Sequence, residues 1–532
     1  MSGIVVCVDP RAADEGALVL EAGGNAFDAA IAAAFVQMVV TPFSCGIGGM
    51  VSAQLWKGDS AQQFVVDGLL RAGSLVTDDM WASDYKGESE FMGGSLFEDH
   101  RSEMGYTSIC TPGAVSALSE IHRHLGSIPW ADLLKPAIRI AHNGFLFTPI
   151  TPSNLVENRG YFEPDQLTRI NATDECSRLF YRDKGTVPTY GEMFRNADYG
   201  NTLQHLADQG PEDFYTGDLA DIIAKDLERN GAFVTKEDLA EYSNNIYSPD
   251  LAVYRDHHIR TNLSPGGGPL LLQALRIWEG LDIGNMDHSS ADHLAYVGST
   301  LQLINQERRH FLGDLAHLGH EMPRKMSSPE RISTLREAVL NGVVGGETLP
   351  PESPDTTHIT VVDRNGDVAC ITHSNGQHSG VVTPGLGFVY NNGMSRFDPR
   401  PGRASSLAPR KTRVHMMTPT IVFKGGKPKV IVGAPGGNTI VSALLQTVSN
   451  VVDFGMGSLE AVSTSRIHAE GSTIWCETQI RSEVIKALQK RGFTVVQEPR
   501  SFAQVQLVVI DQDSELKGAS DPRGNGGVVY VK

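Results

Sequence analysis

One junction constrains the fold of this chain more than any other stretch. A proline-rich segment, Leu349 to Pro354, leads into residues Asp355 to Asp363, where hydroxyl-bearing and apolar side chains alternate. The prolines exclude a helix, and the alternation predicts a β-strand that ends at the turn Arg364 to Asp367. Two interpretations follow. The segment is either an ordinary hairpin strand with a polar face, or a self-cleavage site at which Thr356 becomes a new N-terminus and a nucleophile.

The same junction separates a mainly helical part of the chain from a strand-rich part. Helical spacing of apolar residues predicts helices at Ala12 to Ala22, at Ala26 to about Val40, and repeatedly between Pro112 and Asp314. After Thr356 we predict a helix at Thr439 to about Val452 and strands at Asp367 to Ser374, Gly387 to Tyr390, Pro419 to Phe423, Lys429 to Val432, Thr494 to Gln497 and Val505 to Asp511. Helices and strands in blocks favour a layered α+β fold.

Charge and cysteine content narrow the partners and the compartment. A net charge of −17 argues against binding to nucleic acid or to anionic lipid. Six scattered cysteines give no disulfide framework, and Met1 to Pro10 lacks the pattern of a secretory signal. The apolar stretch Ala29 to Val40 is too short to cross a bilayer, so it is predicted to be a buried helix. We therefore expect a cytoplasmic protein.

Two features suggest a metal or a nucleotide, and neither has the required spacing. His310, His317 and His320 lie close together in sequence, but glycines break the helical spacing and no carboxylate completes a ligand set. The loop Thr41 to Gly49 is rich in glycine, but it lacks the Lys-Ser/Thr ending of a phosphate-binding loop and the spacing of a dinucleotide motif. We expect no metal and no cofactor.

Several separated segments resemble the gamma-glutamyltranspeptidase family of self-cleaving N-terminal-nucleophile hydrolases, and they follow the family's order from end to end. They are Leu20 to Ala30, Cys45 to Gly49, Gly210 to Tyr215, Thr235 to Leu239, Thr356 to His358, Tyr390 to Asn392, Met417 to Thr420, Gly433 to Gly437 and Gly518 to Arg523. The resemblance implies a four-layer αββα sandwich with two antiparallel sheets between helical layers. It also implies cleavage between Asp355 and Thr356 into a large region, 1–355, and a small region, 356–532, that stay associated as one intertwined unit.

The resemblance also assigns the reaction machinery. A threonine hydroxyl needs a base, and the freed α-amine of Thr356, with a reference pKa of about 7.7–8.0, can serve near neutral pH. Gly436 and Gly437 match the family's oxyanion-hole pair, where glycines let backbone N–H groups approach the developing oxyanion. Ser374 matches a hydroxyl residue that hydrogen-bonds the catalytic threonine, and Asn375 beside it is a further candidate.

The residues that read the substrate depart from the family. Where the family has an arginine that holds the α-carboxylate of a γ-glutamyl group, this chain has Leu69, with Arg71 two residues further along as a potential substitute on the same strand face. The stretch containing Asn392 is kept, but Arg396 stands where the family has an acidic residue for the α-ammonium group. His415 and Met416 replace a serine pair. Each lost charged contact costs roughly 2–5 kcal/mol, so efficient γ-glutamyl transfer is not expected.

These departures leave three functions open. We prefer an autoprocessing amidohydrolase or acylase that forms an acyl-enzyme on Thr356 and hydrolyses a small-molecule amide whose acyl part carries a carboxylate and no free α-amine. A basic loop, Arg396 to Arg413, would then form an anion-attracting rim, although a solvated loop explains it equally well. The alternatives are a true γ-glutamyl hydrolase or transferase (a glutathione hydrolase) that uses Arg71, and a non-catalytic binding protein. A homo-oligomer of the two-fragment unit is compatible with all three.

Overall fold

Two antiparallel sheets organise the molecule. The computed structural model describes residues 3–87, 95, 97–147, 164–181, 186–319, 321–342, 356–499 and 502–532. The first sheet has the strand order β18 (Gly527–Val531), β1 (Gly3–Cys7), β9 (Thr357–Val362), β10 (Val368–Ser374), β2 (Met50–Lys57), β3 (Gln62–Gly68) and β6 (Asn245–Tyr247). The second has the order β17 (Leu516–Ser520), β16 (Gln506–Ile510), β12 (Lys427–Gly433), β11 (Thr420–Lys424), β8 (His257–Thr261) and β7 (Asp250–Tyr254).

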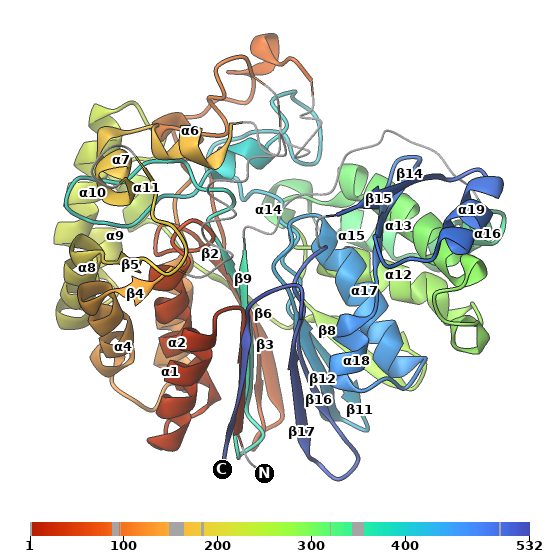
Figure 1. Ribbon diagram of the computed structural model, residues 1–532. Helices are drawn as coiled ribbons and strands as arrows, with labels where there is room; N and C mark the ends of the chain where they lie inside the picture. Colours follow the sequence, from red (N-terminus) through yellow and green to blue (C-terminus); the bar gives the residue numbers. More distant parts are fainter. Residues whose placement is uncertain are drawn as a thin grey trace.

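The two sheets lie face to face, and helices cover their outer faces (Figure 1). An apolar cluster between the sheets joins side chains of both, including Ile4 and Val362 from the first and Ile431 and Val508 from the second. The first sheet is covered by α1 (Pro10–Glu21), α2 (Ala26–Val40) and α3 (Ala114–Leu125), and behind them lie α4 (Trp130–Asn143), α8 (Ala197–Gln209) and α10 (Asp218–Arg229).

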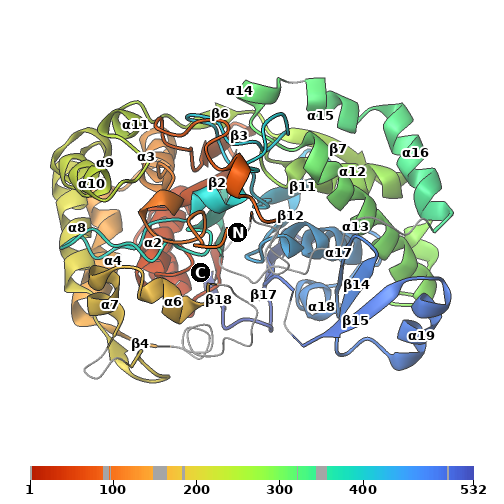
Figure 2. The same cartoon turned by 90° about the horizontal axis from the view of Figure 1, so that it is seen from above.

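A second helical layer covers the other sheet. It contains α12 (Gly268–Glu279), α13 (Ala291–Phe311), α16 (Pro329–Leu340), α17 (Thr439–Val452), α18 (Ser458–Ser463) and α19 (Ser482–Lys490). A small sheet, β13 (Ile467–Glu470), β14 (Thr473–Glu477) and β15 (Thr494–Glu498), packs beside α13 and α19. Seen from above in Figure 2, the two helical groups stand at opposite ends of the molecule. The mixed, antiparallel α+β class that the sequence predicts is therefore confirmed.

Helix α2 shows how the sequence builds the helical layer behind β9 and β10. Asn25 caps it by accepting hydrogen bonds from the backbone N–H groups of Phe27 and Asp28, and the Asp28 carboxylate accepts from Asn25 N in a capping box. All fifteen residues of the helix are buried. Its alanines let the helix lie close against β9 and β10, and the buried helix that the sequence predicts is confirmed. No helix among the described residues has the length and apolar character needed to cross a bilayer.

Two details of the prediction are wrong. Gly387 to Tyr390 is not a strand, because Tyr390 exchanges backbone hydrogen bonds with Val381 and Ser379 in a loop while its ring fills the core. The run of large apolar residues there reflects burial rather than sheet pairing. Arg71 is not on a strand face with Leu69, because β3 ends at Gly68. Arg71 instead forms isolated β-bridges with Thr111 and Thr412.

Candidate active site

Thr356 lies opposite Ser374 because the β9–β10 hairpin fixes the register. Thr357 pairs with His373 across the hairpin, so the residue before β9 faces the last residue of β10. The two hydroxyl oxygens, Thr356 Oγ1 and Ser374 Oγ, are 3.0 Å apart. The backbone N–H of Gly376 donates to Ser374 Oγ at 2.9 Å. Asp355, on the other side of the predicted cleavage bond, lies outside the described residues.

The glycine-rich loop Thr41 to Gly49 wraps the backbone that follows Ser374. Asn375 donates its backbone N–H to Ser44 O at 2.9 Å and its side-chain amide to Pro42 O at 3.3 Å. A Cβ on Gly49 would lie 2.5 Å from Ser374 O, so only glycine fits. Asn375 is fully buried in this contact and is not among the residues lining the cavity described below. Its position therefore suits support of the loop rather than contact with a substrate.

The predicted oxyanion glycines form the turn between β12 and α17. Gly436 has φ +152° and Gly437 has φ +55°, conformations that favour glycine. A Cβ on Gly436 would come within 2.6 Å of the Cβ of Ala503. Thr439 Oγ1 donates to Gly436 O at 2.7 Å and fixes the turn at the start of the helix. Gly437 lines the same cavity as Thr356.

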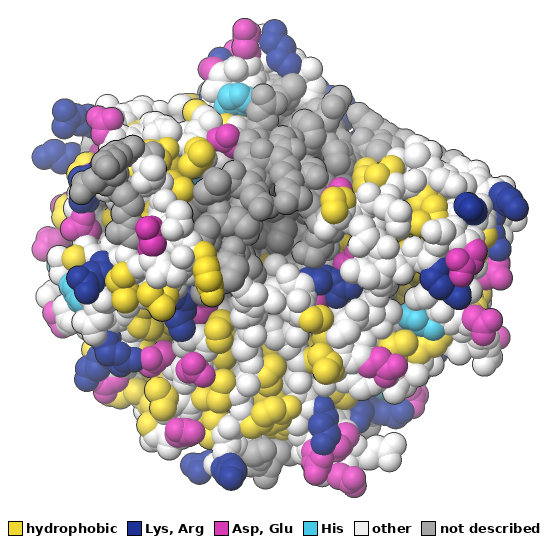
Figure 3. All heavy atoms as spheres, viewed as in Figure 1, with side chains coloured by type: hydrophobic (Ala, Val, Ile, Leu, Met, Phe, Trp, Pro, Cys, Tyr) yellow, Lys and Arg dark blue, Asp and Glu magenta, His cyan; other side chains and the backbone are white. Residues whose placement is uncertain are grey.

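That cavity has a volume of about 1200 Å³ and is strongly basic. Its described lining contains six arginines and two carboxylates: Arg308, Arg309, Arg396, Arg400, Arg403, Arg413, Asp398 and Glu470. Glu470 pairs with Arg308 at 2.7 Å, and Asp398 pairs with Arg400 at 2.8 Å. Both carboxylates are therefore already engaged by cations. The outer face seen in Figure 3 contrasts with the cavity, because basic and acidic side chains are interspersed there.

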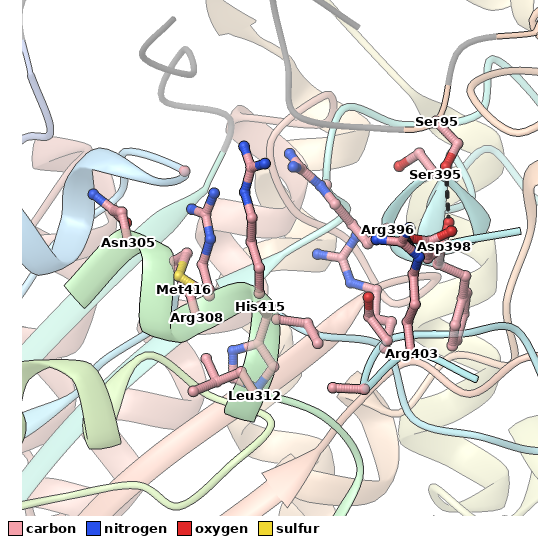
Figure 4. Close-up of a pocket in the computed structure, with 18 of the residues that line it drawn as sticks. Ser95, Asn305, Arg308, Leu312, Ser395, Arg396, Asp398, Arg403, His415 and Met416 are labelled. Carbon is pink, nitrogen blue, oxygen red and sulfur yellow. Dashed lines mark hydrogen bonds and ion pairs between the residues drawn. The ribbon is translucent and has the colours of Figure 1, made fainter. Parts of the chain in front are cut away.

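Some basic side chains of the loop Arg396 to Arg413 line the cavity, and others contact the rest of the protein. Four of its arginines line the cavity, whereas Arg410 pairs with Asp238 at 3.0 Å and Lys411 Nζ donates to Ser406 O at 2.7 Å. Figure 4 shows Arg396, Asp398 and Arg403 on one side of the cavity and Arg308 and Asn305 on the other. The loop is thus part of a cationic wall.

His415 and Met416, which stand at the position of the family's serine pair, both line the cavity. The imidazole of His415 is 4% exposed, and neither ring nitrogen has a hydrogen-bond partner among the described residues. Burial, together with the nearby charge of Arg413, lowers the pKa of His415 to about 3, so the ring is neutral at physiological pH. A neutral imidazole carries one donor and one acceptor nitrogen.

Three other residues that were predicted to contact the substrate, Leu69, Arg71 and Asn392, do not line the cavity among the described residues. Leu69 is buried in an apolar cluster with Met50 and Met417, which themselves line the cavity. The guanidinium of Arg71 lies 5.0 Å from the centre of the Tyr242 ring and donates to Ser243 O at 2.7 Å.

Asn392 supports the loop after Ser374. Its Oδ1 accepts the Gln377 N–H at 2.9 Å, and its amide donates to the Glu103 carboxylate at 3.3 Å. Leu69, Arg71 and Asn392 are all absent from the described lining.

Sequence reasoning missed the arginines of α13 and their partner Glu470. Arg308 and Arg309 occupy the last turn of a long helix, and Glu470 ends β13, a strand that was not predicted. Glu470 Oε2 also accepts from the Asn438 amide at 3.3 Å, which ties this ion pair to the residue after Gly437. The basic run Arg308-Arg309-His310 was the one sequence feature that pointed to these cations, and it matches no known binding motif.

The described residues contain no group of three His, Cys, Asp or Glu side chains placed to hold a metal ion. His310 lines the cavity, and His317 lies 3.4 Å from Asp314. His320, the third histidine considered, lies outside the described residues.

Comparison with known proteins identifies relatives along the full length of the chain. Acylase ACY 1 proenzyme of Pseudomonas sp. (strain SE83) is 32% identical, with 99% of this chain and 93% of the relative aligned. Glutathione hydrolase proenzyme of Escherichia coli (strain K12) is 27% identical over 98% of this chain and 90% of the relative. The crystal structure of cephalosporin acylase from Bacillus halodurans superposes with a TM-score of 0.87 at 27% identity, covering 99% of this chain and 95% of that one.

These relatives define the class first: a hydrolase or transferase of the N-terminal-nucleophile type. The chain matches the family Gamma-glutamyltranspeptidase over residues 12–531 and belongs to that family.

Proposed function

We propose that the protein is a self-cleaving acylase with the four-layer αββα sandwich of N-terminal-nucleophile hydrolases, and that it hydrolyses an amide whose acyl part carries a carboxylate. The observation that supports this most directly is the Thr356 hydroxyl, paired with Ser374 in a cavity lined by six arginines.

Self-cleavage begins with attack of Thr356 Oγ1 on the carbonyl carbon of Asp355. The peptide nitrogen takes the hydroxyl proton and becomes the free α-amine of Thr356, while an ester joins the two residues. Water hydrolyses the ester, leaving a carboxylate on Asp355 and restoring the hydroxyl. Region 1–355 and region 356–532 then stay together, because β9 lies between β1 and β10, and both sheets combine strands from the two regions.

Turnover of a substrate repeats the same chemistry. The α-amine takes the hydroxyl proton of Thr356 as the oxygen attacks the substrate amide carbon. Backbone N–H groups of Gly436 and Gly437 stabilise the oxyanion of the tetrahedral intermediate. The amine leaves with a proton from the Thr356 amine, and water then hydrolyses the acyl-enzyme to a carboxylic acid.

The charges in the cavity favour an acyl group with a carboxylate and without an ammonium group. Arginine guanidinium groups match carboxylates in geometry as well as charge. An ammonium group would need a free carboxylate, but Asp398 and Glu470 are each paired with arginines. Arg396, at the position where the family has an acidic residue, adds a further repulsive charge.

Two measurements test this proposal. Mass spectrometry of the purified protein is expected to find a fragment that begins at Thr356, and an adduct on that fragment after incubation with a glutaryl amide. Steady-state kinetics is expected to give a higher kcat/KM for glutaryl-p-nitroanilide than for γ-glutamyl-p-nitroanilide, which differs by the α-ammonium group. Faster turnover of the γ-glutamyl compound would refute the substrate assignment and leave the self-cleaving hydrolase in place.

A γ-glutamyl hydrolase is the second candidate, because glutathione hydrolases are among the relatives. It needs a residue to hold the α-carboxylate, and Arg71 is directed toward Tyr242 and Ser243 instead. If this candidate were correct, Arg71→Ala would abolish γ-glutamyl turnover and spare self-cleavage. A non-catalytic binding protein would remain an uncut chain of 57.5 kDa on a denaturing gel. We also propose a cytosolic location, which rests on the cysteine pattern alone.

A further inference from the structure

The loop 375–380, which follows Ser374 directly, has an unusual backbone. Gly376, His378 and Gly380 have φ values of +72°, +55° and +73°. This left-handed region is uncommon for a residue with a side chain, so His378 indicates that surrounding contacts hold the loop in place. The loop matters to the candidate active site, because the Gly376 N–H donates to Ser374 Oγ at 2.9 Å.

A short helix, α6 (Gln166–Ile170), holds this loop from outside the cavity. The Arg169 side chain is 1% exposed, and its guanidinium donates to His378 O at 2.9 Å and to Gln377 Oε1 at 3.0 Å. Gln166 lies three residues earlier, on the same face of the helix, and its Oε1 is 2.6 Å from His378 Nε2. Two side chains of one helix therefore grip two consecutive residues of the loop.

The charge state of His378 fits this arrangement. Burial, together with the nearby charge of Arg169, lowers the pKa of His378 well below its usual value, so the ring is neutral. Its Nδ1 accepts the Gly380 N–H at 3.1 Å. The proton of the neutral ring is therefore on Nε2, which donates to Gln166.

The opposite side of the guanidinium is tied to the same loop through Glu103. Arg169 Nη2 lies 3.1 Å from Glu103 Oε2, and that oxygen also accepts from the Asn392 amide at 3.3 Å. Asn392 Oδ1 in turn accepts the Gln377 N–H at 2.9 Å. A Cβ on Gly376 would lie 2.4 Å from Asn392 Oδ1, so the packing leaves the loop little room to shift.

The buried pair of Arg169 and Glu103 is suited to fixing geometry. Two buried ions have a desolvation cost that offsets much of their attraction, so such a pair often adds little stability compared with apolar side chains. A guanidinium differs from an apolar side chain because its planar donors fix the directions of several acceptors at once. Here those acceptors include the backbone of the loop 375–380.

We propose that Arg169 and Gln166 are positioning residues, which hold Ser374 against Thr356 through the loop 375–380. Neither side chain is in the described lining of the cavity, so both act on the reaction through other residues. This inference rests on the proposed function. It goes further by assigning a catalytic effect to a helix that contributes no group to the proposed mechanism.

Two substitutions of Arg169 test this role. Arg169→Met removes every donor, whereas Arg169→Lys keeps a charge opposite Glu103 but cannot reach His378 O and Gln377 Oε1 together. A displacement of about 1 Å in a catalytic geometry can cost on the order of 10²-fold. Arg169→Met is therefore expected to slow self-cleavage about tenfold or more, and to lower kcat of the cleaved enzyme for glutaryl-p-nitroanilide by a similar factor with KM changed less than about threefold. Arg169→Lys is expected to lie between wild type and Arg169→Met.

A double-mutant cycle with Ser374→Ala separates positioning from a general effect on folding. If Arg169 acts through Ser374, Arg169→Met is expected to change the self-cleavage rate by less than about twofold once Ser374 is alanine. Equal fold-losses in the two backgrounds would overturn the inference, and so would unchanged rates in both Arg169 variants. If Arg169→Met fails to fold, Arg169→Lys takes its place in the cycle.

Hydrogen exchange followed by mass spectrometry gives a readout that does not depend on activity. Amides of the loop 375–380 are expected to exchange faster in the Arg169 variants, with β9 unchanged. Arg178→Gln is the matched control, because Arg178 lies on the next helix, α7 (Asp174–Phe180), and is 55% exposed in its ion pair with Glu175. It is expected to alter no rate by more than about twofold. A wild type that neither cleaves itself nor forms an adduct would refute the proposed function and the inference with it, whereas additive losses in an active enzyme would overturn the inference alone.

Discussion

Replacing Asp521 with asparagine is expected to destabilise the protein strongly. Asp521 and Arg466 form an ion pair with Nη2 to Oδ2 at 2.5 Å, and their side chains are 0% and 1% exposed. Arg466 Nη2 also donates to the carbonyl oxygens of Phe502 and Ala503 at 3.0 and 3.2 Å. Because Ala503 lies against Gly436, this pair supports the predicted oxyanion turn from behind.

The size of the stability loss depends on which interactions Arg466 and Arg523 keep when the Asp521 carboxylate is removed. Arg523, which also contacts Asp521, keeps its bonds to Glu477 at 2.5 and 2.6 Å, so the loss falls on Arg466. Removing one partner of a buried ion pair costs about 3–5 kcal/mol, because the other charge is left uncompensated. That is a large fraction of the roughly 5–15 kcal/mol by which folded domains are stable.

Urea denaturation, followed by fluorescence on fully self-cleaved protein, measures the effect as a lower midpoint. Asp513→Asn is the matched control, since Asp513 is exposed in the turn between β16 and β17 and is expected to change stability by less than about 0.5 kcal/mol. A loss below about 1 kcal/mol for Asp521→Asn would show that the ion pair does not carry the stability assigned to it.

Further predictions concern the nucleophile, the turn, one helix cap and pH. Thr356→Ala is expected to leave a single chain of 57.5 kDa on a denaturing gel, whereas Thr356→Ser is expected to yield two fragments. Gly436→Ala is expected to lower kcat for amide hydrolysis on the order of 10²-fold in steady-state kinetics, since a Cβ there would meet Ala503 at 2.6 Å and move the proposed oxyanion donors. Asn25→Ala is expected to cost about 1 kcal/mol in denaturation, through loss of the cap of α2. Burial raises the pKa of Asp521, but Arg466 and Arg523 outweigh it and hold the pKa below its usual value. The stability from this pair is therefore full above a pH of about 4 and is lost as pH falls through the lowered pKa, so wild type and Asp521→Asn are expected to converge in acid.

The position of Thr356 beside Ser374 follows from local rules, whereas the roles proposed for the two residues come from the family resemblance. The turn at Arg364 to Asp367 closes a hairpin, and Gly366 adopts φ +78° there. Once that turn is located, pairing residues outward from it brings Thr356 opposite Ser374, the arrangement observed. The cap of α2 and the Gly436–Gly437 turn are equally local, since each depends on residues close together in sequence.

The substrate cavity could not be predicted to the same extent, because its walls come from segments that are far apart in sequence. Arg308 reaches the cavity only because α13 packs beside β13, and nothing in the helix sequence indicates which residue it faces. The alternation of side chains along a strand would place Arg71 on the same face as Leu69, which made it a potential substitute for the missing arginine. Because β3 ends at Gly68, the alternation does not reach Arg71. Its backbone pairs instead with Thr111 and Thr412, and this pairing sets the orientation of the residue.

Under the proposed function, the catalytic residues and the substrate-reading residues are held in place in different ways. Thr356 and Ser374 are fixed by two central strands of a sheet whose neighbours come from both ends of the chain, so few substitutions there preserve the geometry. Arg413, His415 and Met416 lie instead on a connection between a loop and β11, held by backbone hydrogen bonds such as His415 N to Pro265 O. Backbone bonds place the segment whatever side chains it carries. If Thr356 is the nucleophile as we propose, changes in the side chains of residues 413–416 would alter substrate preference and leave the nucleophile in place.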